Sequence, residues 1–203
     1  MYIRPATSSD ALAIATVHVR SWKTAYPGLI PQSFLDSLTP EARLQSWNEI
    51  LGPSPEREVT TLVLVDEAEA DADADADLDT DTEPEAAGEP GRDGGLEQIV
   101  GFTTFGRNGD DAPKSVGEVM TLYLDPGVWG DGHGERLLGA ATEALRRDGY
   151  RTATLWVLET NARARRFYER LGWTPDGAKK LHDWKAFVAT DVRYRLELDP
   201  RRP

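Results

Sequence analysis

The chain has 203 residues, of which 39% are hydrophobic, and this length and composition suit one domain with a single core. It has no cysteine, which excludes a disulfide framework, a zinc–thiolate site and a cysteine nucleophile, and it has no apolar run long enough to cross a membrane. The net charge of -12 resides in residues 66–93, which hold 13 acidic residues and one arginine, so the other 22 acidic and 22 basic residues balance and no basic surface for nucleic acid is expected.

The N-terminal quarter predicts one strand followed by helices. The opening residues lack the charged start and apolar stretch of a signal peptide, so we expect a cytoplasmic protein of bacterial origin. A short strand is expected at Ile3–Ala6, and Ser8 or Ser9 suits the cap of a helix that Pro27-Gly28 ends. Further helical regions follow Pro31 and start near Pro40. Apolar residues recur at helical spacing, with Ile14, Val17, Trp22 and Ala25 in the first helix and Leu44, Trp47 and Leu51 in the last.

An acidic segment of low complexity, Asp66–Gly95, lies between two strand-like stretches, Thr60–Val65 and Gln98–Phe105. Like charges at every second position repel one another, and few of these side chains can enter a core, which favours a disordered loop. We interpret the segment as an insertion across a hairpin within a single domain of residues 1–203. Its Asp-x-Asp-x-Asp pattern also suits a calcium loop, but the bending glycine and the distal glutamate of an EF-hand are not at the required positions.

The C-terminal half alternates strands and helices. Asn161 suits the N-cap of a helix, whereas Gly149 and Gly172 suit helix ends. The expected elements are strands at Gly117–Leu124, Thr152–Leu158 and Asp191–Leu198, and helices at Glu135–Asp148 and Asn161–Leu171. The whole order is β-α-α-β-β-β-α-β-α-β, which predicts an α/β fold on a mixed sheet.

A glycine-rich loop lies between a strand and a helix in this half. Gly130, Gly132 and Gly134 let the backbone turn tightly and approach a ligand without Cβ interference. Backbone N–H groups at a helix start and the helix dipole favour an anion, so the loop predicts a phosphate or pyrophosphate site. No lysine follows the glycines as in a P-loop, and the dinucleotide spacing fails because Glu135 and Leu137 stand at the sixth positions. A glycine-rich turn without a ligand is the alternative.

Two motifs follow one another in this half of the chain. They are Trp129-x-x-Gly132-x-Gly134 and Asn161-x-x-Ala164-x-x-x-Tyr168-x-x-x-Gly172-Trp173. Together they resemble the signatures of the GNAT acetyltransferases, strongly over Gly117–Trp173 and weakly over most of the chain. The resemblance implies a twisted, mostly antiparallel mixed sheet with splayed central strands and helices on both faces. It also implies acetyl-CoA as the co-substrate.

The resemblance implies roles toward this cofactor. The backbone of the splayed strand would pair with the pantetheine arm, the glycine loop would hold the pyrophosphate, Asn161 would bond the pantetheine or its neighbourhood, and Tyr168 would stand beside the sulfur. The implied residues are Leu122, Tyr123, Leu124, Trp129, Gly130, Asp131, Gly132, His133, Gly134, Glu135, Asn161 and Tyr168. Gln or Arg is usual where Trp129 stands and a basic residue where Asp131 stands, so we expect weaker cofactor affinity.

The family's reaction moves an acetyl group to an amine, which must lose a proton before it attacks. The resemblance implies Glu118 as the general base and Tyr168 as the acid that protonates the leaving thiolate. A solvated carboxylate at the start of a strand and a tyrosine packed on the sheet are the alternatives. We expect direct attack in a ternary complex, without a covalent intermediate or a metal.

The expected acceptor is a primary amine of a small molecule or peptide. Trp22 and Tyr26 are weak candidates for its pocket, with core packing as the alternative, and His182 and Trp184 are candidates to line the same cleft. His18 is interpreted as a helix residue with satisfied hydrogen bonds. Neither a nucleic acid nor a membrane is expected as a partner, and we expect a monomer or homodimer. A non-catalytic acyl-CoA-binding or interaction module on the same fold is the alternative function.

Overall fold

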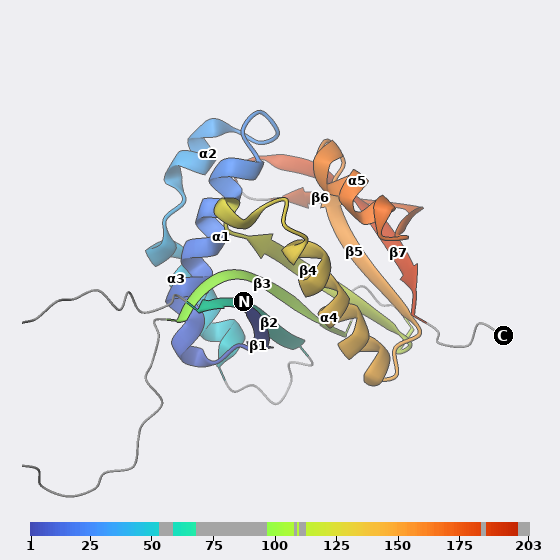
Figure 1. Cartoon of the computed structure of the whole chain (residues 1–203). Coiled ribbons are helices and arrows are strands. Elements are labelled where there is room, and N and C mark those ends of the chain that lie inside the picture. The colour runs from blue at the N-terminus through green and yellow to red at the C-terminus, as the bar shows by residue number, and fades with distance from the viewer. Residues whose placement is uncertain (53–58, 68–96, 108, 110–112, 184–185, 199–203) are drawn as a thin grey trace, which may run out of the picture.

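A computed structural model of the chain shows a seven-stranded sheet with helices on both faces (Figure 1). It describes residues 1–52, 59–67, 97–107, 109, 113–183 and 186–198. The strands are β1 (Tyr2–Pro5), β2 (Val59–Glu67), β3 (Glu97–Arg107), β4 (Val116–Leu124), β5 (Thr152–Leu158), β6 (Thr174–Asp183) and β7 (Val188–Glu197). The helices are α1 (Ala11–Ala25), α2 (Gln32–Ser37), α3 (Pro40–Leu51), α4 (His133–Arg147) and α5 (Ala162–Arg170), with 3₁₀ turns η1 (Ser8–Asp10) and η2 (Pro126–Val128). Within these ranges no helix is both long and apolar enough to span a membrane.

The strand order is β1-β2-β3-β4-β5-β7-β6, and the neighbouring strands are antiparallel except for β4 and β5. This order confirms the predicted mixed, mostly antiparallel sheet. β2 and β3 pair from Val59↔Gly106 to Glu67↔Glu97, on either side of the acidic segment. Asp66 and Glu67 belong to β2, and the rest of the segment lies outside the described residues. The single domain and the disordered insertion therefore stay predictions.

The expected order lacks β6, which pairs with β7 at the edge of the sheet. Most residues of β6 are exposed, and Pro175 and Gly177 interrupt it, so its sequence has no alternating apolar pattern. An edge strand tolerates such residues because one of its sides has no strand partner. The prediction of six strands is therefore wrong. Three helices precede β2, in agreement with the three expected helical regions, although the written order counts only two of them.

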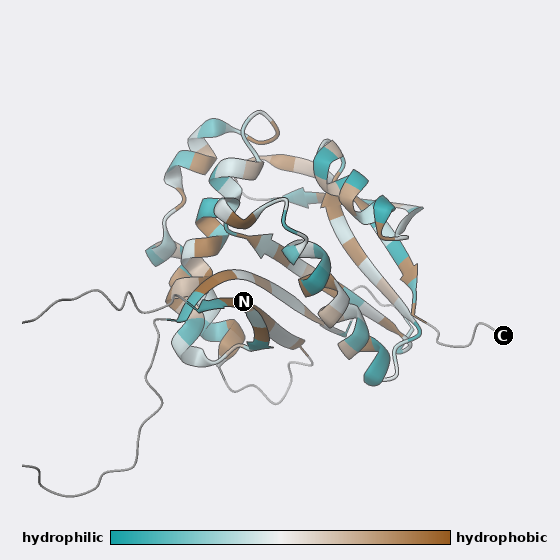
Figure 2. Cartoon of the chain, in the orientation of Figure 1, coloured by the Kyte–Doolittle hydropathy of each residue, from teal (hydrophilic) through white to brown (hydrophobic). Residues whose placement is uncertain are grey.

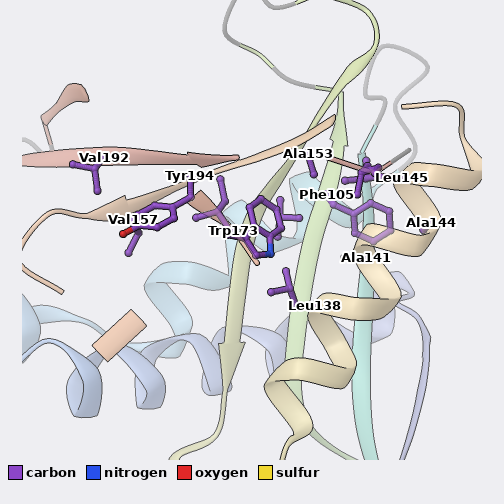
Figure 3. Packing of buried hydrophobic residues seen from close by; sticks show 13 residues of the cluster. Phe105, Leu138, Ala141, Ala144, Leu145, Ala153, Val157, Trp173, Val192 and Tyr194 are labelled. Carbon is purple, nitrogen blue, oxygen red and sulfur yellow. The ribbon is translucent and has the colours of Figure 1, made fainter. Parts of the chain in front are cut away.

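The two faces of the sheet carry separate parts of the core. In β2, Val63 and Val65 pack with α1 and α3, whereas Leu64 packs against Leu137 of α4. Figure 2 shows hydrophobic positions along the strands and a largely hydrophilic α5. On the face covered by α4, the buried Trp173 lies between Tyr194 and Leu138 (Figure 3). This packing fixes α4 and α5 against the central strands.

Candidate active site

The centre of the sheet opens where β4 and β5 separate (Figure 1). Although β4 continues to Leu124 and β5 to Leu158, the strands pair in parallel at three positions only. These positions are Val116↔Thr152, Gly117↔Ala153 and Glu118↔Thr154. Beyond Glu118, the edge of β4 that faces β5 therefore has no strand partner among the described residues. Its backbone N–H and C=O groups can pair with an extended ligand.

This opening forms a cleft of about 770 Å³, a volume that suits a small-molecule site. Most residues that the sequence analysis assigned to the site line it: Trp22, Tyr26, Glu118, Leu122, Tyr123, Leu124, Trp129, Gly130, Gly132, Gly134, Glu135, Asn161 and Tyr168. Asp131 and His133 are the two assigned residues that do not line it. Asp131 is exposed, and Nδ1 of His133 lies 3.3 Å from a guanidinium nitrogen of Arg136. His182 lines the cleft as well, whereas Trp184 lies outside the described residues.

The glycine loop ends at a helix start that no side chain caps. α4 begins at His133, before the predicted Glu135, and its N-cap is Gly132 with a left-handed φ of 80°. The first N–H groups of a helix have no partner within the helix. Because Gly132, Gly134 and Glu135 line the cleft, the positive end of the α4 dipole lies beside it. This arrangement suits a phosphate or pyrophosphate group.

Trp129 is held by two contacts. Its indole N–H donates to the carbonyl oxygen of Leu124 at 3.0 Å, which ties the loop to the end of β4. The guanidinium carbon of Arg163 lies 4.1 Å from the centre of a Trp129 ring, within the range of a cation–π contact. The side chain that replaces the family's usual Gln or Arg therefore positions an arginine at the cleft.

The cleft wall on α5 carries a row of cations. Arg163, Arg166 and Arg170 follow the spacing of one helix face, and all three line the cleft. These arginines were not predicted as site residues, although three arginines at helical spacing after a predicted anion site are a usable signal. They supply positive charge at the cleft, which the acidic Asp131 does not, although a basic residue is usual at its position in the family.

α5 also positions Asn161 and Tyr168. Oδ1 of Asn161 accepts a hydrogen bond from the Ala164 N–H at 3.0 Å, as expected of an N-cap. Tyr168 packs with its ring centroid 6.2 Å from that of Trp173 and 6.3 Å from that of Tyr194. Burial, and then the neighbouring Tyr123, raises the pKa of the Tyr168 hydroxyl. The hydroxyl therefore remains protonated at neutral pH and can donate a proton.

The opposite wall is aromatic. Trp22 and Tyr26 of the α1 region contact each other with ring centroids 4.9 Å apart. Trp22 is 4% exposed and packs in the core, so core packing and cleft lining coincide in this residue. Burial, followed by the neighbouring Tyr123, raises the pKa of Tyr26 well above its usual value.

His18 differs from the expectation of a satisfied helix residue. Its Nδ1 accepts a hydrogen bond from the Trp47 indole N–H at 3.2 Å, and its ring stacks on Tyr123 at 4.9 Å. Its Nε2 is buried and has no hydrogen-bond partner among the described residues. The expectation is therefore wrong for one of the two ring nitrogens. Burial, and then the charge of Arg43, lowers the pKa of His18 to about 3, so the imidazole is neutral.

The splayed strands, the uncapped helix start and the two motifs define an acetyltransferase of the GNAT type. The Acetyltransferase (GNAT) family pattern matches residues 45–173, and the chain belongs to this family.

Among its relatives, the uncharacterized N-acetyltransferase YuaI of Bacillus subtilis is 25% identical over 159 residues, which are 78% of this chain and 72% of that protein. A mycothiol acetyltransferase of Geodermatophilus obscurus is 44% identical over 66 residues, 32% of this chain and 21% of that relative. The match thus spans about a fifth of the mycothiol acetyltransferase.

Two solved structures share the fold. The PaiA N-acetyltransferase of Thermoplasma acidophilum, in complex with coenzyme A, has a TM-score of 0.59 and 18% identity, with 97% of this chain and 98% of that chain covered. YncA of Salmonella typhimurium, with its cofactor acetyl-CoA, has a TM-score of 0.58 and 19% identity, with 100% of this chain and 96% of that chain covered. At these identities the likeness shows the fold.

Proposed function

We propose that this chain transfers the acetyl group of acetyl-CoA to a primary amine of a small molecule or peptide, by direct attack in a ternary complex. The observation that carries the proposal is one cleft that joins the unpaired edge of β4 to the uncapped start of α4. Acetyl-CoA matches both features, because its extended thioester arm suits the unpaired edge of β4 and its pyrophosphate suits the start of α4. Tyr168, with its protonated hydroxyl, lines the same cleft.

The residues present fit CoA. Leu122 and Tyr123 would offer backbone groups to the amides of the pantetheine arm, while the Leu124 carbonyl already accepts from Trp129. The N–H groups at the start of α4 would hold the pyrophosphate, and the arginines of α5 would add positive charge.

In the proposed reaction, Glu118 accepts a proton from the acceptor ammonium, directly or through water. The neutral nitrogen then attacks the thioester carbonyl carbon, which forms the C–N bond and a tetrahedral oxyanion, and the collapse of this intermediate breaks the C–S bond. Tyr168 donates its proton to the leaving sulfur, and the nitrogen releases its second proton, which restores the phenol. A backbone N–H of β4 would stabilise the oxyanion. The products are an amide, free CoA thiol and one proton.

Gly132→Val should weaken CoA binding by on the order of tenfold or more, which corresponds to about 1.4 kcal/mol. A β-branched residue does not readily adopt the left-handed conformation of Gly132, so the start of α4 would shift. Titration calorimetry measures the effect, with Gly139→Val, an exposed position of α4 outside the cleft lining, as the matched control. If folded Gly132→Val binds CoA as tightly as the control, the pyrophosphate lies elsewhere.

Arg163→Ala should weaken CoA binding about fivefold at low salt, and the loss should shrink as salt screens the charge. Asp131→Arg should tighten binding by a smaller factor, because Asp131 is exposed and does not line the cleft. Calorimetry at two salt concentrations measures both changes, and Arg147→Ala at the end of α4 removes a cation outside the cleft lining. An Arg163→Ala variant that behaves like Arg147→Ala would show that the α5 arginines do not compensate for Asp131.

A further inference from the structure

The acceptor side of the cleft is preformed and apolar. It is lined by Trp22, Tyr26, Ile30, Tyr123, Leu158 and Phe187. Trp22 and Ile30 belong to one buried hydrophobic cluster between α1, α2 and the sheet, and the other four residues pack against this cluster. The ring centroids of Phe34 and Phe187 lie 5.1 Å apart, so Phe187, the residue before β7, packs on α2. Such a wall suits a ligand with an aromatic or similarly apolar body.

One carboxylate interrupts this wall. Asp191 of β7 lines the cleft, is 9% exposed and lies opposite Leu158 in the register of β5 and β7. Its Oδ2 lies 3.2 Å from Nδ1 of His182 on β6. Burial is the main cause of the raised pKa values of Tyr26 and Tyr123, and the negative charge of Asp191 adds to both. The Asp191 carboxylate therefore lies near enough to Tyr26 and Tyr123, in the aromatic part of the cleft, for its charge to affect their hydroxyl groups.

Among the described residues, two cations near Asp191 on β6 and β7 are engaged elsewhere. Lys180 is the Cα partner of Asp191 on β6, but its ammonium nitrogen lies 4.2 Å from the centre of a Trp156 ring. Arg193 of β7 forms an ion pair with Asp176 at 2.7 Å. A carboxylate in an apolar site is costly unless a charged or hydrogen-bonding partner compensates it. His182 contacts Oδ2 of Asp191, and a ligand ammonium would add a partner with a permanent positive charge.

We infer that the acceptor is a primary amine on an aromatic or similarly apolar body, and that Asp191, oriented by His182, binds its ammonium group. This inference rests on the proposed function and narrows its acceptor class. The body of the acceptor packs on Trp22, Tyr26 and Phe187, and the cation lies at the carboxylate. An acceptor with a carboxylate beside its amine is disfavoured, because it places a like charge near Asp191.

Binding of two amines to the CoA-saturated chain tests the inference without requiring turnover. By calorimetry, 2-phenylethylamine should bind at least about tenfold more tightly than ethanolamine, because its ring is buried on the apolar wall. Asp191→Asn should weaken 2-phenylethylamine binding about 10- to 100-fold and leave CoA affinity unchanged. His182→Gln, which keeps the carboxylate, should weaken it severalfold. Asp183→Asn is the matched control, because this exposed carboxylate does not line the cleft.

The outcomes separate this inference from the proposed function. Equal binding of the two amines overturns the inference, as does an Asp191→Asn variant that binds 2-phenylethylamine as tightly as Asp183→Asn. In either case acetyl transfer to other amines still supports the proposed function. Tight binding of 2-phenylethylamine that depends on Asp191, without release of CoA thiol from acetyl-CoA, supports the amine site and contradicts the transferase proposal.

Discussion

Tyr168→Phe should lower kcat by about 10² to 10⁴, the usual contribution of a general acid, while acetyl-CoA affinity stays nearly unchanged. The substitution keeps the ring that packs near Trp173 and Tyr194 and removes only the proton donor. Because burial raises the pKa of Tyr168, its hydroxyl stays protonated well into the alkaline range. The ratio of parent to variant kcat should therefore remain constant from about pH 6 to about pH 9.

Steady-state rates of thiol release and calorimetry with CoA measure these two effects. Tyr150→Phe removes the same atom outside the cleft lining and should behave like the parent. If Tyr168→Phe turns over at the rate of Tyr150→Phe with a good acceptor, water or another group protonates the leaving sulfur.

Glu118→Gln should lower kcat/KM by about 10² to 10⁴ near neutral pH. Glu118 lies at the last paired position of β4 and β5 and lines the cleft, so it is placed where the strands begin to separate. An alkyl ammonium has a pKa of about 10, so the acceptor loses its own proton as the pH rises, and the deficit should shrink. This pH dependence distinguishes the base from Tyr168, whose deficit should stay constant.

A pH–rate profile of kcat/KM for Glu118→Gln measures this prediction, with Glu41→Gln on the exposed surface of α3 as the control. A Glu118→Gln profile that coincides with that of Glu41→Gln would contradict the role of the base. The acceptor would then bind in its neutral form or lose its proton to another group.

Regular local patterns made much of the fold predictable. β5 occupies Thr152–Leu158 as expected, because its residues are mostly buried and bounded by Gly149 and Asn161. The start of α4 differs from the prediction, because Gly132 in the left-handed conformation caps the helix and His133 and Gly134 join its first turn. β6 was unpredictable from periodicity, since an exposed edge strand needs little apolar surface.

The glycine-loop side of the cleft was easier to predict than the side that contains Asp191 and His182. Gly130, Gly132 and Gly134 form one contiguous motif, so their spacing alone indicates an anion site. By contrast, Asp191 meets His182 only through the pairing of β6 and β7, and no sequence spacing predicts that register. Contacts between distant segments must come from the tertiary structure.

The most direct test of the account follows the acetyl group itself. Acetyl-CoA labelled with ¹³C in the acetyl group is incubated with the chain and a panel of primary amines that includes 2-phenylethylamine. Mass spectrometry then measures labelled amide, and a thiol reagent measures free CoA. The proposed transfer should give equimolar labelled N-acetyl amide and free thiol, with both rates lowered equally in Tyr168→Phe. Tight binding of acetyl-CoA without labelled amide from any amine of the panel would contradict it and support a non-catalytic acyl-CoA-binding module.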